Sequence, residues 1–188
     1  MMTQEHAGSA AEWPQSYVAA DLREWVSQDT LVRLALTVVQ TIQPNRLDPA
    51  APPHETRGLP PRMILTLLTY CYAVGIYSSH AIEERAELDD TIRYLCARQR
   101  PRADLVRRFR HRNREIIAQC LERVCLAAGR IKFGSAATWP NPVGPRDSAT
   151  AAWMWPLLRL QIACEAKERL NQAEAADFDP SAEEAWAA

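Results

Sequence analysis

The chain has 188 residues, with 22 basic side chains against 23 acidic ones and a hydrophobic fraction of 47%. This length predicts one domain or at most two, and the composition excludes a chain that is disordered throughout. Five cysteines without a C-x-x-C spacing argue against a disulfide framework or a zinc site and favour a reducing compartment. No signal-like start or bilayer-length apolar stretch is present, so we expect a cytoplasmic protein without a membrane partner.

One helix is predicted between two irregular segments at the start of the chain. Residues 1–20 read as a flexible leader rich in Ala, Gln, Ser and Glu. Asp29 is expected to cap a helix whose apolar residues recur at helical spacing as far as Ile42. The stretch 43–61 contains six prolines, too many for a regular element, and is predicted to be a linker or extended loop.

Three helices are predicted next, over residues 61–75, 78–88 and 89–96. Pro61 opens the first of them, because a proline at the first helical position loses no hydrogen bond. A serine (Ser78 or Ser79) and an aspartate (Asp89 or Asp90) are expected to cap the other two.

The longest helix is predicted to begin at Pro101 and to end at Gly129, in the usual C-terminal position of a glycine. Residues 131–133 are expected to form a short strand, and a second amphipathic helix is expected over 156–176 with a frayed acidic end. No stretch between residues 20 and 130 alternates apolar and polar residues, so this part is predicted to be all-α. The expected organisation is a leader (1–20), a multi-helix domain (21–134) and a proline-broken segment with an acidic tail (135–188).

The near-zero net charge hides two regions of opposite sign. Residues 98–114 hold eight arginines and one acid, Asp104, for a net charge of +7. Residues 165–188 hold seven acids and two bases, for a net charge of −5. A local basic patch is the feature that indicates a nucleic-acid partner, and the guanidinium fork suits phosphate and guanine.

Three consecutive helices of which the last is basic are typical of a helix-turn-helix module. At about 100° per residue, the long helix is expected to bury one apolar stripe and to expose a guanidinium face. The apolar stripe comprises Leu105, Val106, Phe109, Ile116, Cys120 and Val124. The candidate DNA-binding residues are Arg98, Arg100, Arg102, Arg107, Arg108, Arg110, His111 and Arg114. The alternative is a solvated arginine face that has no partner.

No other motif predicts a site. Ser78, Ser79 and His80 are adjacent in sequence, but a serine beside a histidine is more simply a helix cap than a nucleophile and its base. Neither G-x-x-x-x-G-K-[ST] nor G-x-G-x-x-G occurs, so no nucleotide loop is predicted. We expect no catalytic residue, metal ligand or cofactor.

Several motifs in order resemble the N-terminal domain of bacterial insertion-sequence transposases of the DDE class, the InsH-type N-terminal domain. They are Leu22-Arg23-Glu24-Trp25, Leu59-Pro60-Pro61-Arg62-Met63, Tyr70-x-Tyr72-x-x-Gly75, Ser78-Ser79-x-x-Ile82-Glu83, Arg93-Tyr94-Leu95 and Arg108-Phe109-Arg110. The resemblance covers roughly residues 20–134. It implies a helical DNA-binding module that recognises the ends of a mobile element and precedes a ribonuclease-H-like domain with three metal-binding carboxylates.

The sequence departs from the family at two places. The run Pro-Asp-His-x-Thr of the family is here Pro101-Arg102-Ala103-Asp104-Leu105, so the DNA target could differ. Trp139 stands where the family has its first catalytic aspartate, and the other two carboxylates have no place in the remaining sequence. Three acids of the C-terminal region, Asp147, Asp177 and Glu183, are expected to be solubilising charges. We therefore expect a transposase-like chain that is not an enzyme.

Two functions remain open at this point. The first is binding of double-stranded DNA by a truncated or catalysis-deficient transposase-like protein, acting at insertion-sequence ends or as a regulator, with a gene remnant as a variant. The second is a helical interaction module that pairs with a second copy or with an intact transposase, its acidic tail shielding the basic face. Binding that weakens steeply with salt would favour the first.

Overall fold

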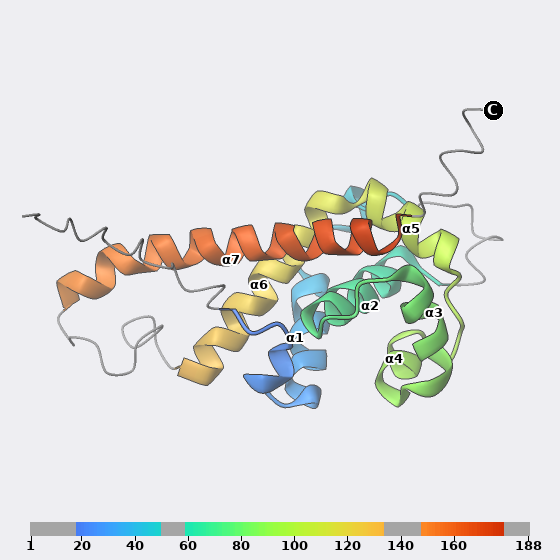
Figure 1. The fold of residues 1–188 in the computed structure, drawn as a ribbon, viewed down its shortest axis with the longest axis horizontal. Helices are drawn as coiled ribbons and strands as arrows, with labels where there is room; N and C mark the ends of the chain where they lie inside the picture. The colour runs from blue at the N-terminus through green and yellow to red at the C-terminus, as the bar shows by residue number, and fades with distance from the viewer. Residues whose placement is uncertain (1–17, 50–58, 134–147, 179–188) are drawn as a thin grey trace, which may run out of the picture.

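The computed structural model describes residues 18–49, 59–133 and 148–178, and the regular elements of these residues are all helical. The α-helices are α1 (Gln28–Gln40), α2 (Pro61–Ala73), α3 (Ser79–Leu88), α4 (Asp90–Leu95), α5 (Ala103–Arg112), α6 (Arg114–Phe133) and α7 (Ser148–Ala176) (Figure 1). Two short 3-10 helices, η1 (Leu22–Glu24) and η2 (Pro44–Arg46), flank α1. The prediction of an all-α fold is confirmed, and none of the described helices is long and apolar enough to cross a membrane.

Local signals set the starts of the early helices. Pro61 occupies the first turn of α2, and Ser78 and Asp89 cap α3 and α4, as predicted. The prediction for α1 is wrong by two residues. Its cap is Ser27, whose hydroxyl accepts a hydrogen bond from Thr30 N at 3.3 Å, while Asp29 lies in the first turn, where the helix dipole favours a carboxylate.

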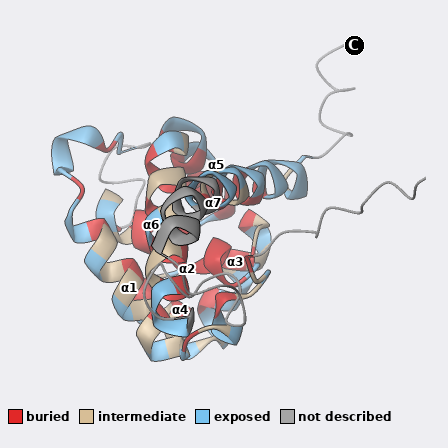
Figure 2. Ribbon diagram, turned by 90° about the vertical axis from the view of Figure 1, so that its left-hand side faces the viewer, coloured by how far each residue is buried: buried red, intermediate tan, exposed pale blue. Residues whose placement is uncertain are grey.

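Helix α2 is the centre of the molecule. Every residue from Ile64 to Ala73 is buried, and Figure 2 shows this helix enclosed by the others. Helices α1, α4, α5, α6 and α7 all pack against it. A helix that is apolar around most of its circumference is stable only inside such a shell.

The long basic helix predicted from Pro101 to Gly129 is two helices. Asn113 has φ −115° and ψ 22°, outside the helical range, and separates α5 from α6. Its side chain donates to the Asp48 carbonyl at 2.9 Å and to the Phe109 carbonyl at 3.0 Å, and it accepts from Asp48 N at 2.9 Å. The helix bends here because Asn113 binds the loop that follows η2. The predicted apolar stripe is nevertheless buried on both helices.

Two predictions for the end of this region are wrong. Gly129 does not end the helix, and residues 131–133 form the last turn of α6 rather than a strand. A glycine inside a helix costs about 1 kcal/mol relative to alanine. Packing of the buried residues Val124, Cys125 and Ala128 on α6 offsets that cost.

Helix α7 lies across the other helices and completes their core (Figure 1). It begins at Ser148, before Pro156, the expected start, and its residues Ile162, Ala166, Leu170 and Ala173 are buried. The predicted separate C-terminal segment is therefore part of the same core as far as the end of α7.

A buried arginine fastens α7 to the rest of the fold. Arg169 is 0% exposed and its Nη1 donates to the carbonyls of Tyr72 at 2.9 Å and Ala73 at 3.1 Å. Its Nη2 donates to the Ala19 carbonyl, and its Nε donates to Glu165 at 3.0 Å. These carbonyls belong to the C-terminal end of α2 and to the segment before η1, so one guanidinium joins three parts of the chain. The core also includes Val18, so the described fold begins within the predicted leader.

Candidate nucleic-acid interface

Helices α3, α4 and α5 form a small group in which α3 packs against both of the others. The turn from α4 to α5 is strained, because Ala97 (φ 49°) and Arg98 (φ 60°) are both left-handed without being glycine. The turn is held by backbone bonds from Ala97 N to the Tyr94 carbonyl at 3.0 Å and from Arg98 N to the Arg93 carbonyl at 2.8 Å. This arrangement leaves the Arg98 side chain exposed at the approach to α5.

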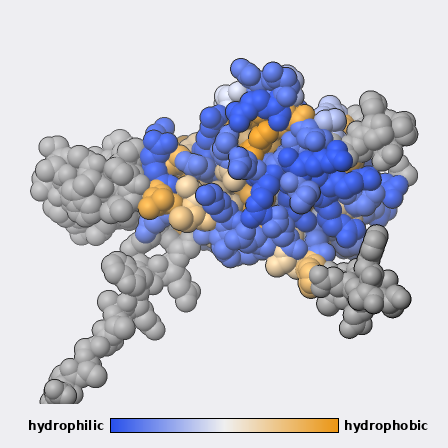
Figure 3. Space-filling model, turned by 90° about the horizontal axis from the view of Figure 1, so that it is seen from above, coloured by the Kyte–Doolittle hydropathy of each residue, from blue (hydrophilic) through white to orange (hydrophobic). Residues whose placement is uncertain are grey.

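Three of the predicted site residues are exposed, and the described part of the chain offers them no ion-pair partner. Among the residues that the structure describes, no carboxylate lies within ion-pair distance of Arg98, Arg107 or His111. Arg107 and His111 are one turn apart and therefore share a face of α5. Seen from above, the surface over α5 and the C-terminal half of α7 is mainly hydrophilic (Figure 3).

Three more predicted residues take part in exposed ion pairs. Arg100 lies 3.1 Å from Glu83 and 2.6 Å from Glu87, both on α3. The Asp104 carboxylate lies 3.0 Å from Arg102 and 3.3 Å from Arg108. The three arginine side chains are 45–57% exposed.

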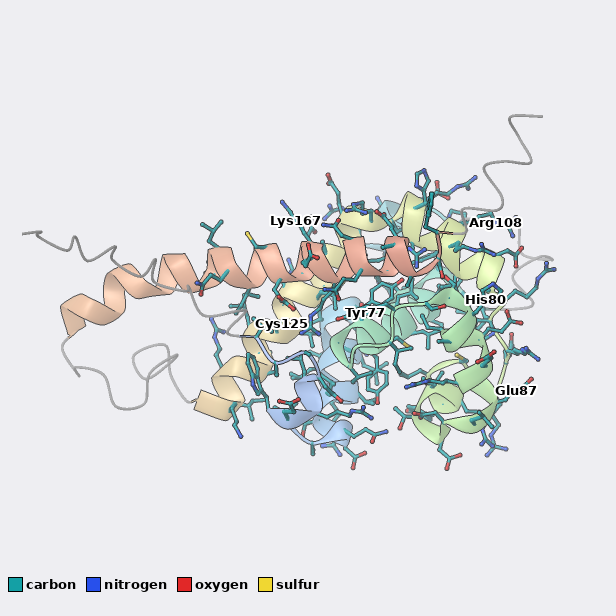
Figure 4. The ribbon with its side chains drawn as sticks, viewed as in Figure 1. Tyr77, His80, Glu87, Arg108, Cys125 and Lys167 are labelled. Atoms are coloured by element: carbon teal, nitrogen blue, oxygen red, sulfur yellow. The ribbon has the colours of Figure 1, made fainter. Side chains whose placement is uncertain are left out.

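Exposed pairs of this kind contribute about 0–1 kcal/mol each, so a phosphate can replace the carboxylate at little cost. In Figure 4, His80, Glu87 and Arg108 lie along one edge of the molecule, which α3 and α5 form together. The paired arginines belong to the same stretch of chain, residues 98–111, as Arg98, Arg107 and His111.

Arg110 is not on the exposed face, contrary to the prediction. Its side chain is 4% exposed and donates to Asp177 at 2.6 Å, to the Tyr72 hydroxyl at 3.1 Å and to the Ser79 hydroxyl at 3.4 Å. Sequence periodicity placed Arg110 at the flank of the exposed face, but its partner lies at the far end of α7. This arginine holds the fold together and is not available to a ligand.

Asp177 is likewise not the solubilising charge that was predicted. Its carboxylate accepts from Ser79 N at 2.8 Å and from the Ser79 hydroxyl, at the start of α3. Burial would raise the pKa of Asp177, but hydrogen bonds from Ser79 and Arg110 outweigh it and hold the pKa below its usual range. The last turn of α7 is therefore fixed to α3 and α5 rather than frayed. Asp147, Glu183 and Trp139 lie outside the described residues.

Arg114, the last predicted site residue, points toward α7. It pairs with Glu174 and donates to Asn171 Oδ1 at 2.6 Å. The Arg114 side chain is 39% exposed, and that of Glu174 43%. The predicted basic face is thus divided into an open part on α5 and a part that α7 covers.

Sequence reasoning missed two structural residues. Asn113 at the bend carries no local signal, because its partner Asp48 is distant in sequence. The sequence does give a local signal for Arg169. It follows Ala166 by three residues and precedes Leu170, so it lies on the apolar face of α7. A charged residue in such a row predicts a buried cation that binds backbone carbonyls.

The remaining features do not add to this interface. A cavity of about 410 Å³ lies between α1, α2 and α4, and its lining includes Leu36, Val39, Met63, Tyr94 and Leu95. Its single cation, Arg62, already donates to the Ile42 carbonyl at 2.7 Å. Within the described part of the chain, no group of three His, Cys, Asp or Glu side chains is placed to hold a metal ion.

Comparison with known families decides the assignment of the N-terminal part. Residues 20–112 match the family model described as Transposase domain (DUF772). The match indicates a transposase-type domain in these residues. The transposase domain includes η1 and α1 to α5, and so contains the strained turn and the exposed arginines. It confirms the transposase part of the sequence resemblance and indicates a role connected with transposition. No curated protein and no solved structure matches the chain.

Proposed function

We propose that this chain binds double-stranded DNA at the ends of an insertion sequence, as an InsH-type N-terminal domain does, and that residues 1–188 do not themselves catalyse strand transfer, because Trp139 stands at the position of the family's first catalytic aspartate. The contact surface is the open part of the basic face. Arg98, Arg107 and His111 form its centre, and Arg100, Arg102 and Arg108 form its border. The transposase domain supports this proposal because it contains all six residues.

The observation that carries the proposal is that Arg107 and His111 are exposed on one face of α5 and have no carboxylate within ion-pair distance among the described residues. An isolated exposed helix usually mixes charges of both signs, whereas the solvent-facing side of α5 is almost wholly basic. Its ten residues span about 15 Å, and a B-DNA major groove about 12 Å wide admits a helix.

In this proposal α3, α4 and α5 act as a helix-turn-helix-like module with α5 in the groove. Arg107 and His111 reach base edges, while Arg98 and Arg102, at the approach to α5, contact phosphates. Arg100, Arg102 and Arg108 then exchange their carboxylate partners Glu83, Glu87 and Asp104 for phosphate oxygens.

The test is a double substitution with a matched control. Arg98→Ala with Arg107→Ala removes two charges from the surface, and Arg33→Ala with Arg46→Ala removes two exposed charges from α1 and η2. We expect wild-type affinity for a duplex to fall steeply between about 50 and 200 mM salt, as counterion release requires. The first variant should lose affinity, and the slope of log K against log salt should fall by about one, because Arg98 contacts a phosphate whereas Arg107 contacts base edges.

Two results would contradict the proposal. One is wild-type binding that barely changes with salt, and the other is an equal loss of affinity in both double variants. A strand-transfer assay on the same protein with a divalent metal tests whether the chain lacks catalytic activity, and we expect no transfer product. Trp139, at the position of the family's first catalytic aspartate, supports that expectation.

A further inference from the structure

The C-terminal part of α7 and the residue that follows it carry a polar side chain at every third position from Glu168 to Asp177. We call this set the acidic row; it consists of Glu168, Asn171, Glu174 and Asp177. Residues three apart are neighbours on a helix surface, so the row forms one continuous strip. The Asn171 amide donates to Glu168 Oε2 at 3.2 Å, which links the first two members.

The acidic row contacts two arginines of the basic face. Asp177 pairs with the buried Arg110, and this contact fixes the position of the row. Glu174 pairs with Arg114, whose guanidinium also donates to Asn171. Only the second contact is exposed to solvent, at 39% and 43% for the two side chains, so only there can a dissolved anion compete.

We propose that the acidic row of α7 competes with DNA phosphate for Arg114 and thereby lowers the affinity of the adjacent DNA-binding surface. The proposal rests on the proposed function and describes the regulation of that surface. Arg114 follows His111 by three residues, across the bend at Asn113, so DNA placed on α5 brings phosphates near it. The carboxylate of Glu174 occupies the position that such a phosphate would take.

Because the Arg114–Glu174 pair is exposed, the competition lowers the affinity for DNA moderately and does not abolish binding. An exposed ion pair is worth at most about 1 kcal/mol, which corresponds to a factor of about five in a binding constant.

The test is Glu174→Gln, which removes the charge and keeps a hydrogen-bond acceptor. We expect its affinity for a duplex at about 50 mM salt to rise about two- to five-fold, and the gain to shrink toward about 200 mM salt because exposed charges are screened. Glu24→Gln is the matched control: it removes one exposed charge from η1, which lies at the opposite side of the molecule from α5 (Figure 1). The melting temperature of each variant verifies that the fold is intact.

A second pair of variants, made in a chain that already carries Arg114→Ala, tests whether the gain in DNA affinity depends on Arg114. When Arg114→Ala is already present, Glu174→Gln should give no gain beyond that of Glu24→Gln. A gain in wild type equal to that of the control, or one that persists without Arg114, would overturn the inference and leave the proposed function standing. Absence of DNA binding by every variant would overturn both. Binding by Glu174→Gln but not by wild type would support both.

Discussion

The guanidinium of Arg110 and the carboxylate of Asp177 lie 2.6 Å apart, and each side chain is 4% exposed although 67 residues separate them in sequence. The same carboxylate accepts the Ser79 backbone N–H at the start of α3. One ion pair therefore joins α5, α3 and the end of α7. The arginine that sequence periodicity assigned to the ligand-facing side belongs to the core.

Replacement of Asp177 tests the role of this pair. Asp177→Asn keeps the size of the side chain and leaves the buried Arg110 without a counter-charge, so we expect a loss of about 3 kcal/mol in the free energy of unfolding. Urea denaturation measures it as a lower midpoint with an unchanged slope. Glu174→Gln, which breaks an exposed pair, should cost less than about 1 kcal/mol. Equal losses in the two variants would contradict the structural role of Asp177.

The same pair predicts the response to acid. The pKa of Asp177 is lowered in the folded protein, so the unfolded chain binds its proton first as the pH falls. The stabilisation is fully present above the unfolded pKa of about 3.9 and is lost as the pH falls through the lower folded value. Unfolding free energies of wild type and Asp177→Asn, measured between pH 7 and strong acid, should converge below about pH 4. If the difference in unfolding free energy between the two proteins stays constant over this pH range, the charge of the Asp177 carboxylate does not stabilise the fold.

Arg169 provides a test in which the charge is retained. Arg169→Lys keeps a cation but cannot reach the carbonyls of Tyr72, Ala73 and Ala19 together, because an ammonium lacks the guanidinium fork. Since hydrogen bonds to charged groups contribute about 1.5–3 kcal/mol, we expect a loss of at least about 2 kcal/mol on chemical denaturation. The control is Lys167→Arg, at an exposed position on the same helix that Figure 4 labels. It should leave stability within about 0.5 kcal/mol of wild type.

The bend between α5 and α6 depends on one amide. Asn113→Ala removes its bonds to the Asp48 N–H, the Asp48 carbonyl and the Phe109 carbonyl, of which the last keeps only the bond from the backbone N–H of residue 113. We expect a loss of about 2–3 kcal/mol in stability and faster hydrogen exchange at the Asp48 amide. Asn171→Ala, which removes an exposed contact, serves as the control. Unchanged exchange at Asp48 would show that the loop is held by something other than Asn113.

The parts of the fold that depend on neighbouring residues could be predicted from the sequence. The caps Ser78 and Asp89 and the first-turn Pro61 act within one helical turn, and their helices begin where they indicate. The end at Gly129 was wrong because glycine is a weak signal that packing of α6 against other helices overrides. A local signal is reliable only where no distant contact opposes it.

The candidate site could likewise be predicted only where it depends on contacts within one helix. Arg107 and His111 are exposed as predicted because their orientation follows from the apolar stripe of α5. The burial of Arg110 and the cover over Arg114 could not be predicted, since both depend on where α7 packs. The pattern of charges along one helix does not determine where another helix packs against it.

The contacts of α7 also have a consequence for biosynthesis. Because the chain leaves the ribosome from its N-terminus, α2, α3 and α5 are made before the residues that satisfy them. Until Arg169 and Asp177 have emerged, the last carbonyls of α2 have no capping cation and Arg110 has no counter-charge. The nascent helices therefore reach their final packing only after the last turn of α7 has been translated.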